Sequence, residues 1–138
     1  MIGVVVVTHG QLAGELVSAA ETIVGDLPHV KAVSIGWHED VQDARQEIAA
    51  AIESVAGPEG VLVATDMFGG TPSNLGMTFL ETGKVEVVTG VNLPMLIKLA
   101  DLRDTASLLE AARQIREHGR TAIWVASDLL RGETGGTA

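Results

Sequence analysis

The chain of 138 residues contains no cysteine and no tyrosine, and only two tryptophans and two phenylalanines. The absence of cysteine excludes disulfides and thiolate metal sites, and it is compatible with the cytoplasm. With so few aromatic side chains, a platform for stacking nucleic-acid bases is not expected. Lysine and arginine are also scarce, nine against 18 acidic residues, for a formal net charge of −9. Such a chain is poorly suited to binding nucleic-acid phosphates or anionic membrane surfaces.

Long apolar runs are missing as well. No segment approaches the length of a membrane span, and the first residues lack the basic region and cleavage site of a signal peptide. We therefore expect no membrane insertion and a cytoplasmic location. Hydrophobic residues still make up 46% of the chain, which predicts a sizeable core. We predict one domain over residues 1–130, followed by a disordered Gly/Thr-rich tail over 131–138.

Short apolar runs alternate with amphipathic stretches along the chain. Runs rich in β-branched residues predict strands over 2–7, 30–35, 61–64, 85–88 and 121–126. Apolar residues at helical spacing predict helices over 12–23, 44–55, 72–80, 93–100 and 104–118, the last one stopped by Gly119. Strands that alternate with helices are typical of an α/β protein with a mainly parallel sheet.

Three segments that directly follow predicted strands carry the residues most suited to chemistry. The first strand ends in Thr8-His9-Gly10, the third is followed by "DMFGGTPSN" (66–74), and the fourth by "TGVNLPML" (89–96). Open parallel sheets bind their ligands at the carboxyl ends of the strands. If the first and third strands are neighbours, His9 and Asp66 meet at that edge.

A histidine beside a carboxylate has a specific chemical meaning. Asp66 would accept the proton of one ring nitrogen of His9, which fixes the tautomer and leaves a lone pair on the other nitrogen. Such a nitrogen can act as a base, a metal ligand or a nucleophile.

The glycine-rich turn that follows Asp66 supplies a second part. Gly69 and Gly70 let backbone N–H groups approach a ligand closely, with Thr71 predicted as the N-cap of a helix and Pro72 as its first residue. Free N–H groups at a helix N-terminus favour an anion such as a phosphoryl group. Together the two parts predict a histidine that carries a phosphoryl group.

Each of these features also has a plainer interpretation. A histidine at a strand end is usually ordinary, two glycines often form only a tight turn, and Asp66 or Thr71 could simply cap local structure. The functional interpretation depends on their convergence at one edge of the sheet. The other histidines, His29, His38 and His118, are expected at the surface, where Trp37 and His38 are candidates for the rim of the site.

Other motifs with a known mechanism are absent. The sequence has no GxGxxG after the first strand, no Walker A motif and no GxSxG, which argues against dinucleotide binding, a P-loop and a serine hydrolase. A receiver domain would need an acidic pair after the first strand. A metal or anion site built from His9 and Asp66 stays an alternative, although no third metal ligand is clearly placed.

The segments "THG", "DMFGGTPSN" and "GVNLPML", taken together and in this order, resemble the EIIA component of the mannose-type phosphotransferase system. This resemblance spans nearly the whole chain. It implies that His9 is the phosphorylated residue, that Asp66 orients it, and that Gly69, Gly70 and Thr71 bind the phosphoryl group. It also implies a phosphotransferase without a metal or cofactor, which takes its phosphoryl group from HPr and passes it to a histidine of a separate EIIB chain for sugar uptake.

The resemblance also implies a fold and a mode of assembly. The family's sheet is doubly wound, with strand order 2-1-3-4 and an antiparallel fifth strand, here 121–126, which homodimers exchange. Apolar residues beside the site are interpreted either as partner contacts or as core: Met67, Phe68, Leu93 and Met95. Two further uses stay open, a regulatory EIIA-like protein of an incomplete system and a subunit of a dihydroxyacetone system, and the sugar cannot be inferred from the chain.

Overall fold

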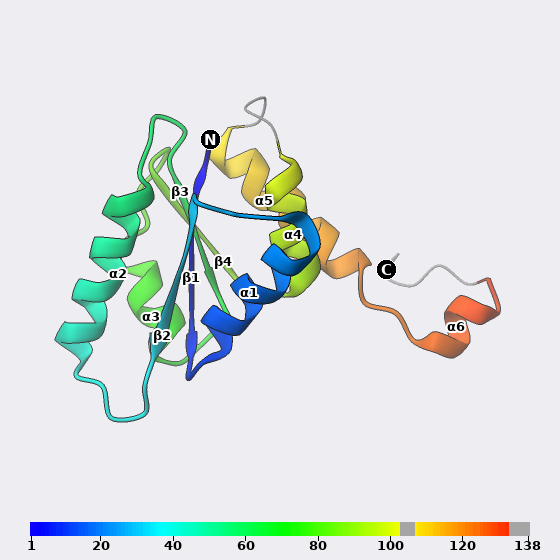
Figure 1. Ribbon diagram of the computed structural model, residues 1–138, viewed down its shortest axis with the longest axis horizontal. Helices are drawn as coiled ribbons and strands as arrows, with labels where there is room; N and C mark the ends of the chain where they lie inside the picture. The colour runs from blue at the N-terminus through cyan, green and yellow to red at the C-terminus, as the bar shows by residue number, and fades with distance from the viewer. Residues whose placement is uncertain (103–106, 133–138) are drawn as a thin grey trace.

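The computed structural model describes residues 1–102 and 107–132. A parallel four-stranded sheet in the order β2-β1-β3-β4 forms its centre (Figure 1). This confirms the predicted order and makes β1 and β3 neighbours. The strands are β1 (Gly3–His9), β2 (Val30–Ile35), β3 (Val61–Thr65) and β4 (Val85–Thr89).

Helices cover both faces of the sheet (Figure 1). One face packs against α2 (Val41–Val55) and α3 (Thr71–Met77), and the other against α1 (Leu12–Val24), α4 (Leu93–Asp101) and α5 (Leu108–Thr121). A short helix, α6 (Ala126–Leu130), lies beyond α5 near the end of the chain. Among the described residues, no helix combines the length and apolar character that a membrane span requires.

The central strand β1 explains why the chain folds in this way. Val4 and Val6 belong to the core cluster under α1, α4 and α5, whereas Val5 and Val7 belong to the cluster under α2 and α3. All four valines are buried. The uninterrupted β-branched run is therefore the signature of a strand that is covered on both faces, as parallel sheets require.

The start and end of α5 differ from the prediction over 104–118. The helix begins at Leu108, where Ser107 accepts a hydrogen bond from the backbone N–H of Glu110 at 3.2 Å, and residues 103–106 lie outside the described part. It continues through Gly119 to Thr121. Gly119 is a packing position and not a helix stop, because a Cβ there would lie 2.7 Å from the Met95 side chain.

The predicted antiparallel fifth strand is not present in the described chain. Thr121 ends α5, residues 122–125 have no regular structure, and Ala126 begins α6. A strand needs a partner for its backbone N–H and C=O groups, and this segment leads away from the sheet (Figure 1). The apolar pattern of the segment was visible in the sequence, but the pattern does not show where a pairing strand lies. The predicted tail begins with a turn at Arg131 and Gly132, and residues 133–138 lie outside the described residues.

Candidate functional site

His9 and Asp66 lie side by side at the carboxyl edge of the sheet. Nδ1 of His9 is 2.7 Å from Oδ2 of Asp66, and the same oxygen accepts a hydrogen bond from the backbone N–H of His9 at 3.0 Å. The parallel pairing of β1 with β3 causes this contact, because Val7 pairs with Thr65 and both strands end at the same edge. The expected meeting of the two side chains is thus present in the structure.

The protonation of this pair determines which ring nitrogen of His9 is available. Partial burial raises the pKa of Asp66, but hydrogen bonds from the His9 ring and backbone outweigh it and hold the pKa below its ordinary value. An ionised carboxylate only accepts hydrogen bonds, so Nδ1 must donate. In the neutral ring the lone pair therefore resides on Nε2, and the side chain is 52% exposed.

The turn between β1 and α1 holds His9 in place. The hydroxyl of Thr8, which is buried, accepts a hydrogen bond from the backbone N–H of Ala13 at 2.7 Å. Gly10, with a φ of 56°, donates its backbone N–H to the carbonyl of Ile35 at 2.9 Å. The backbone on both sides of His9 is therefore tied to the helix that follows it and to the neighbouring strand.

The glycine turn after β3 lies against the ring of His9. Gly69 and Gly70 both have a φ of 89°, a backbone conformation that residues with a Cβ atom rarely adopt. A Cβ on Gly70 would lie 3.2 Å from both Cε1 and Nε2 of His9. The backbone of Gly70 therefore reaches the free nitrogen closely, which a larger residue would obstruct.

The start of α3 is shifted by one residue from the prediction. Gly70, not Thr71, is the N-cap, and its carbonyl accepts a hydrogen bond from the backbone N–H of Asn74 at 3.0 Å. The positive φ at the cap explains the shift, because a threonine there would be strained. Thr71 is the first helical residue and is exposed. Pro72 lies in the first turn of α3, where its missing backbone N–H costs no hydrogen bond within the helix.

Ser73 supports this turn and was missed by the sequence reasoning. Its side chain is fully buried, and its hydroxyl accepts a hydrogen bond from the backbone N–H of Gly69 at 2.9 Å. This bond fixes the glycine turn next to His9. A serine four residues after the first glycine, inside the first turn of the expected helix, was the available signal.

Comparison with known proteins shows the family of the chain. The model of the family described as "PTS system fructose IIA component" matches residues 3–116. The chain belongs to the mannose-type EIIA family of the phosphotransferase system. The sheet order agrees with the fold of that family, and phosphoryl transfer is the general role of its members.

Three relatives show how far the similarity to other EIIA proteins extends. The chain is 28% identical to the PTS system fructose-specific EIIA component of Bacillus subtilis over 94% of its own length and 90% of that protein. It is 30% identical to the mannose-specific EIIAB component of Escherichia coli K12 over 75% of its length, but spans only 32% of that relative. The mannose/sorbose-specific IIA subunit of Enterococcus faecalis superposes with a TM-score of 0.79 at 28% identity, over 90% of this chain and 93% of that one.

The four apolar residues expected beside the site have different positions in this EIIA fold. Met67 and Phe68 are exposed in the loop after β3. Met95 is 3% exposed and belongs to the core, so its interpretation as a partner contact is wrong. Its backbone N–H is held by the Asn92 side chain at 3.2 Å, which places Met95 in the first turn of α4. Leu93 is partly buried against the same core, and its role stays a prediction.

The remaining histidines lie away from Asp66. His38 and His118 are exposed, as expected. His29 is only partly exposed, and its Nδ1 is buried without a hydrogen-bond partner in the described part of the chain. Burial and the nearby N-terminal amine lower the pKa of His29. Within residues 1–102 and 107–132, no three His, Cys, Asp or Glu side chains are grouped to hold a metal ion.

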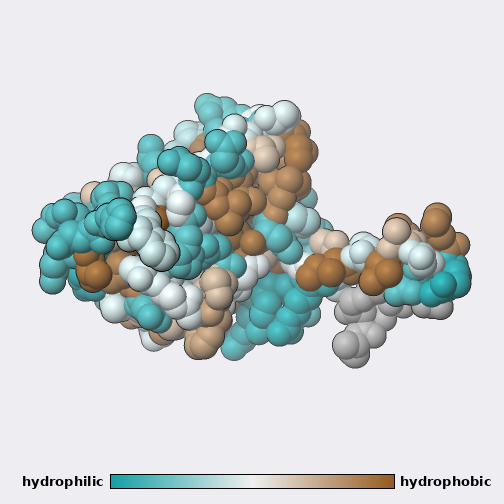
Figure 2. Space-filling view, turned by 90° about the horizontal axis from the view of Figure 1, so that it is seen from below, coloured by the Kyte–Doolittle hydropathy of each residue, from teal (hydrophilic) through white to brown (hydrophobic). Residues whose placement is uncertain are grey.

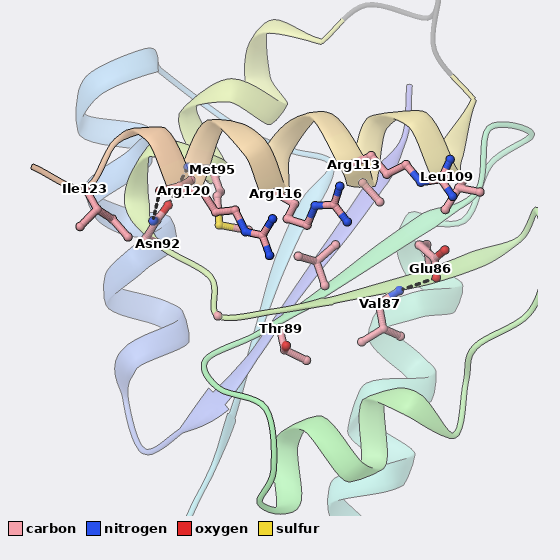
Figure 3. A pocket seen from close by; sticks show the side chains of 14 residues that line it. Glu86, Val87, Thr89, Asn92, Met95, Leu109, Arg113, Arg116, Arg120 and Ile123 are labelled. Carbon is pink, nitrogen blue, oxygen red and sulfur yellow. Dashed lines mark hydrogen bonds between the residues drawn. The ribbon is translucent and has the colours of Figure 1, made fainter. Parts of the chain in front are cut away.

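A groove of about 560 Å³ runs along the outer edge of β4, away from β1 and β3 (Figure 3). Three arginines of α5 extend along it: Arg113, Arg116 and Arg120. Its floor includes residues 86–90, and Ile123 closes one end. At this edge Val85 pairs with Glu81, and the backbone N–H of Val87 donates to the Glu86 side chain at 3.1 Å.

Proposed function

We propose that the chain is a phosphoryl carrier that accepts a phosphoryl group from phospho-HPr on Nε2 of His9 and passes it to a histidine of an EIIB protein. The observation that carries this proposal is the 2.7 Å contact between Nδ1 of His9 and Asp66. Because the carboxylate holds Nδ1–H, the neutral ring presents its lone pair on an exposed Nε2.

The proposed transfer is an in-line exchange between two histidines. The lone pair of His9 Nε2 attacks phosphorus, the P–Nε2 bond forms, and the P–N bond of the donor breaks, returning its electron pair to the donor nitrogen. No proton has to move. The phosphorylated His9 ring keeps its proton on Nδ1 and carries positive charge, which the carboxylate of Asp66 stabilises.

The glycine turn is the proposed binding site for the phosphoryl oxygens. The backbone N–H groups of Gly70 and Thr71 donate to no other group in the described residues, and the exposed Thr71 hydroxyl lies beside them. Gly69 contributes conformation, because its own N–H is already bonded to Ser73. Pre-positioned donors of this kind stabilise the charge on the transferred group without reorganisation.

The final acceptor is proposed to be a sugar. Relatives of the chain are named for fructose, mannose and sorbose. We propose that the phosphoryl group reaches a sugar of this class through EIIB, that the carrier works in the cytoplasm, and that membrane components select the sugar.

Radioactive phosphoenolpyruvate, enzyme I and HPr test the phosphoryl-carrier proposal directly. The wild-type chain and His38→Ala are expected to take up label, whereas His9→Ala takes up none. The label should be acid-labile and alkali-stable, as expected of a P–N bond. Label retained in a folded His9→Ala protein would refute the proposal, as would a wild-type chain that stays unlabelled while HPr is phosphorylated.

We also propose a homodimer in which each chain places residues 121–126 along β4 of its partner. The groove beside β4 and the exposed side chains of Ile123, Trp124 and Val125 support this arrangement. Strand addition would cover an edge that no strand of the described residues pairs with beyond the bridge between Glu81 and Val85.

A further inference from the structure

The glycine turn beside His9 contains three successive peptide planes that are held in different ways. In the first plane, the backbone N–H of Gly69 donates to the Ser73 hydroxyl at 2.9 Å. In the third plane, the carbonyl of Gly70 accepts from the backbone N–H of Asn74 at 3.0 Å. The middle plane joins Gly69 to Gly70, and neither its carbonyl nor its N–H has a hydrogen-bond partner among the described residues. The direction of the Gly70 N–H therefore depends on the two planes that flank it.

Two consecutive glycines leave the middle plane free to rotate unless both neighbouring planes are fixed, because glycine adopts positive and negative φ with similar ease. The N–H of Thr71 lies in the same rigid plane as the Gly70 carbonyl, so the bond from Asn74 holds it. The N–H of Gly70 has no such direct support. It is held only if Ser73 also fixes the plane before Gly69.

Ser73 holds the turn from beneath the surface. Figure 2 looks onto the carboxyl edge of the sheet, where brown apolar groups and teal hydrophilic ones are mixed, but Ser73 is not among the surface groups, since its exposed fraction is 0%. Burying a hydroxyl is unfavourable unless it is hydrogen-bonded, and an alanine would fill nearly the same space without that cost. A buried serine at this position therefore fits a role in holding the turn better than a role in packing.

The helix that carries Ser73 is itself held firmly against β3. A Cβ on Gly76 of α3 would lie 3.4 Å from the side chains of both Thr65 and Val63, so the backbone of α3 lies directly on that strand. The same strand ends at Thr65, immediately before Asp66. Ser73 and Asp66 thus act from one rigid support, on the turn and on the His9 ring respectively.

We infer that Ser73 is a positioning residue for phosphoryl transfer: by accepting the N–H of Gly69, it holds the N–H of Gly70 in place for an oxygen of the phosphoryl group. This inference rests on the proposed function, in which that N–H binds the transferred group. Ser73 does not touch the phosphoryl group itself. Because a donor that is held in advance needs no reorganisation during transfer, Ser73 acts on the chemical step and not on the binding of HPr.

The first measurement is the initial rate of His9 phosphorylation as a function of HPr concentration, with enzyme I and phosphoenolpyruvate in excess. For Ser73→Ala we expect kcat to fall about tenfold and the KM for HPr to stay within about twofold of wild type. This loss is smaller than the roughly 10²–10³-fold that follows deletion of an oxyanion-hole donor, because the Gly70 N–H is still present but no longer held. Ser73→Cys, of similar size but with a weaker acceptor, should have an intermediate kcat.

Ser107→Ala is the matched control. Ser107 also accepts a backbone N–H at the start of a helix, from Glu110 at 3.2 Å. The next residue, Leu108, lies close to Gly60, which precedes β3, so this serine is at the opposite end of the sheet from His9. Ser107→Ala should lower the stability of the fold and leave both kcat and KM like those of wild type.

The second measurement follows the backbone amide resonances by nuclear magnetic resonance before and after phosphorylation of His9. In wild type, the amide protons of Gly70 and Thr71 should both shift downfield as they bind phosphoryl oxygens. In Ser73→Ala, the shift of Gly70 should shrink while that of Thr71 persists, because Asn74 still holds the plane of Thr71. General loosening of α3 would reduce both shifts together.

The outcomes separate this inference from the proposed function. If the wild-type chain is not phosphorylated on His9, the proposed function fails and the inference with it. If wild type is phosphorylated but Ser73→Ala keeps its kcat, only the positioning role is overturned. The same holds if Ser107→Ala loses kcat equally, if the KM for HPr rises in place of the fall in kcat, or if the shifts of Gly70 and Thr71 disappear together.

Discussion

At the scale of single residues, His9 and Asp66 show what a sequence can predict and why. Each lies at the end of an apolar, β-branched run, and such runs predict buried parallel strands. The position of both residues at the carboxyl edge of the sheet could therefore be predicted. Which ring nitrogen is free could not be predicted, because it depends on the side-chain geometry that joins Nδ1 to Asp66. The position of Ser73 was a signal for its hydrogen bond with Gly69, but a weak one, since serine is common at helix starts for other reasons.

Asp66→Asn tests the orienting carboxylate. The amide cannot neutralise the positive charge of the phosphorylated ring, and it can also offer an N–H to Nδ1 and so favour the wrong tautomer. The corresponding change in a serine protease triad costs about 10⁴-fold, and we expect a loss of about 10²-fold or more in the rate of His9 phosphorylation. Rapid-quench labelling measures it, with Asp26→Asn as an exposed control. A rate within threefold of wild type would show that Asp66 is not needed for transfer.

The Asp66 pair also predicts a dependence of stability on pH. The pKa of Asp66 is lowered in the folded chain, so its contribution to stability is present above the unfolded-state pKa near 4 and is lost as pH falls through the folded value. Urea unfolding at pH 7 and pH 3.5 should therefore show a smaller loss of stability in Asp66→Asn than in wild type. Equal losses in the two proteins would contradict the assignment of the ionised carboxylate.

At the scale of elements, strand positions were easier to predict than helix ends. β2 begins and ends where its apolar run does, whereas α5 passes through Gly119, which looked like a stop signal. Local sequence signals such as glycine describe the backbone alone. They do not reveal that Met95 from another helix fills the space where the Gly119 side chain would be.

Gly119→Ala distinguishes a packing glycine from a helix stop. Because the new methyl group would meet Met95 at 2.7 Å, we expect the free energy of unfolding to fall by about 1–3 kcal/mol, the usual range for overpacking. Gly14→Ala in α1 is the matched control: nothing lies within 4 Å of its Cβ position, and a gain of about 0.5–1 kcal/mol is expected. Chemical denaturation measures both, and a stabilised Gly119→Ala protein would refute the packing role.

At the scale of the whole molecule, the C-terminal part of the chain is what the sequence predicted least well. The run of Ile123, Trp124 and Val125 was expected to be a strand, yet in the single chain it has no strand to pair with and remains largely exposed. The apolar pattern of this segment is typical of a strand, but a strand needs a neighbouring strand, and the single chain does not supply one to this segment. The groove along the outer edge of β4 in Figure 3 is the complementary feature.

Ile123→Asp tests the proposed exchange of this segment. Light scattering coupled to gel filtration should give the wild-type chain twice its monomer mass of 14.4 kDa. The Ile123→Asp variant should elute as a monomer, because a carboxylate would have to be buried along β4. Ile23→Asp, at an exposed position on α1, should remain dimeric. A monomeric wild-type chain, or a dimer that Ile123→Asp leaves intact, would contradict strand exchange.

The central claim is that Nε2 of His9 accepts the phosphoryl group, and nuclear magnetic resonance of the ¹⁵N-histidine-labelled, HPr-phosphorylated chain tests it most directly. We expect a phosphorus–nitrogen coupling at Nε2 of His9 alone, with a proton retained on Nδ1 opposite Asp66. Phosphorus bonded to Nδ1 of His9, or to any other residue, would contradict the account.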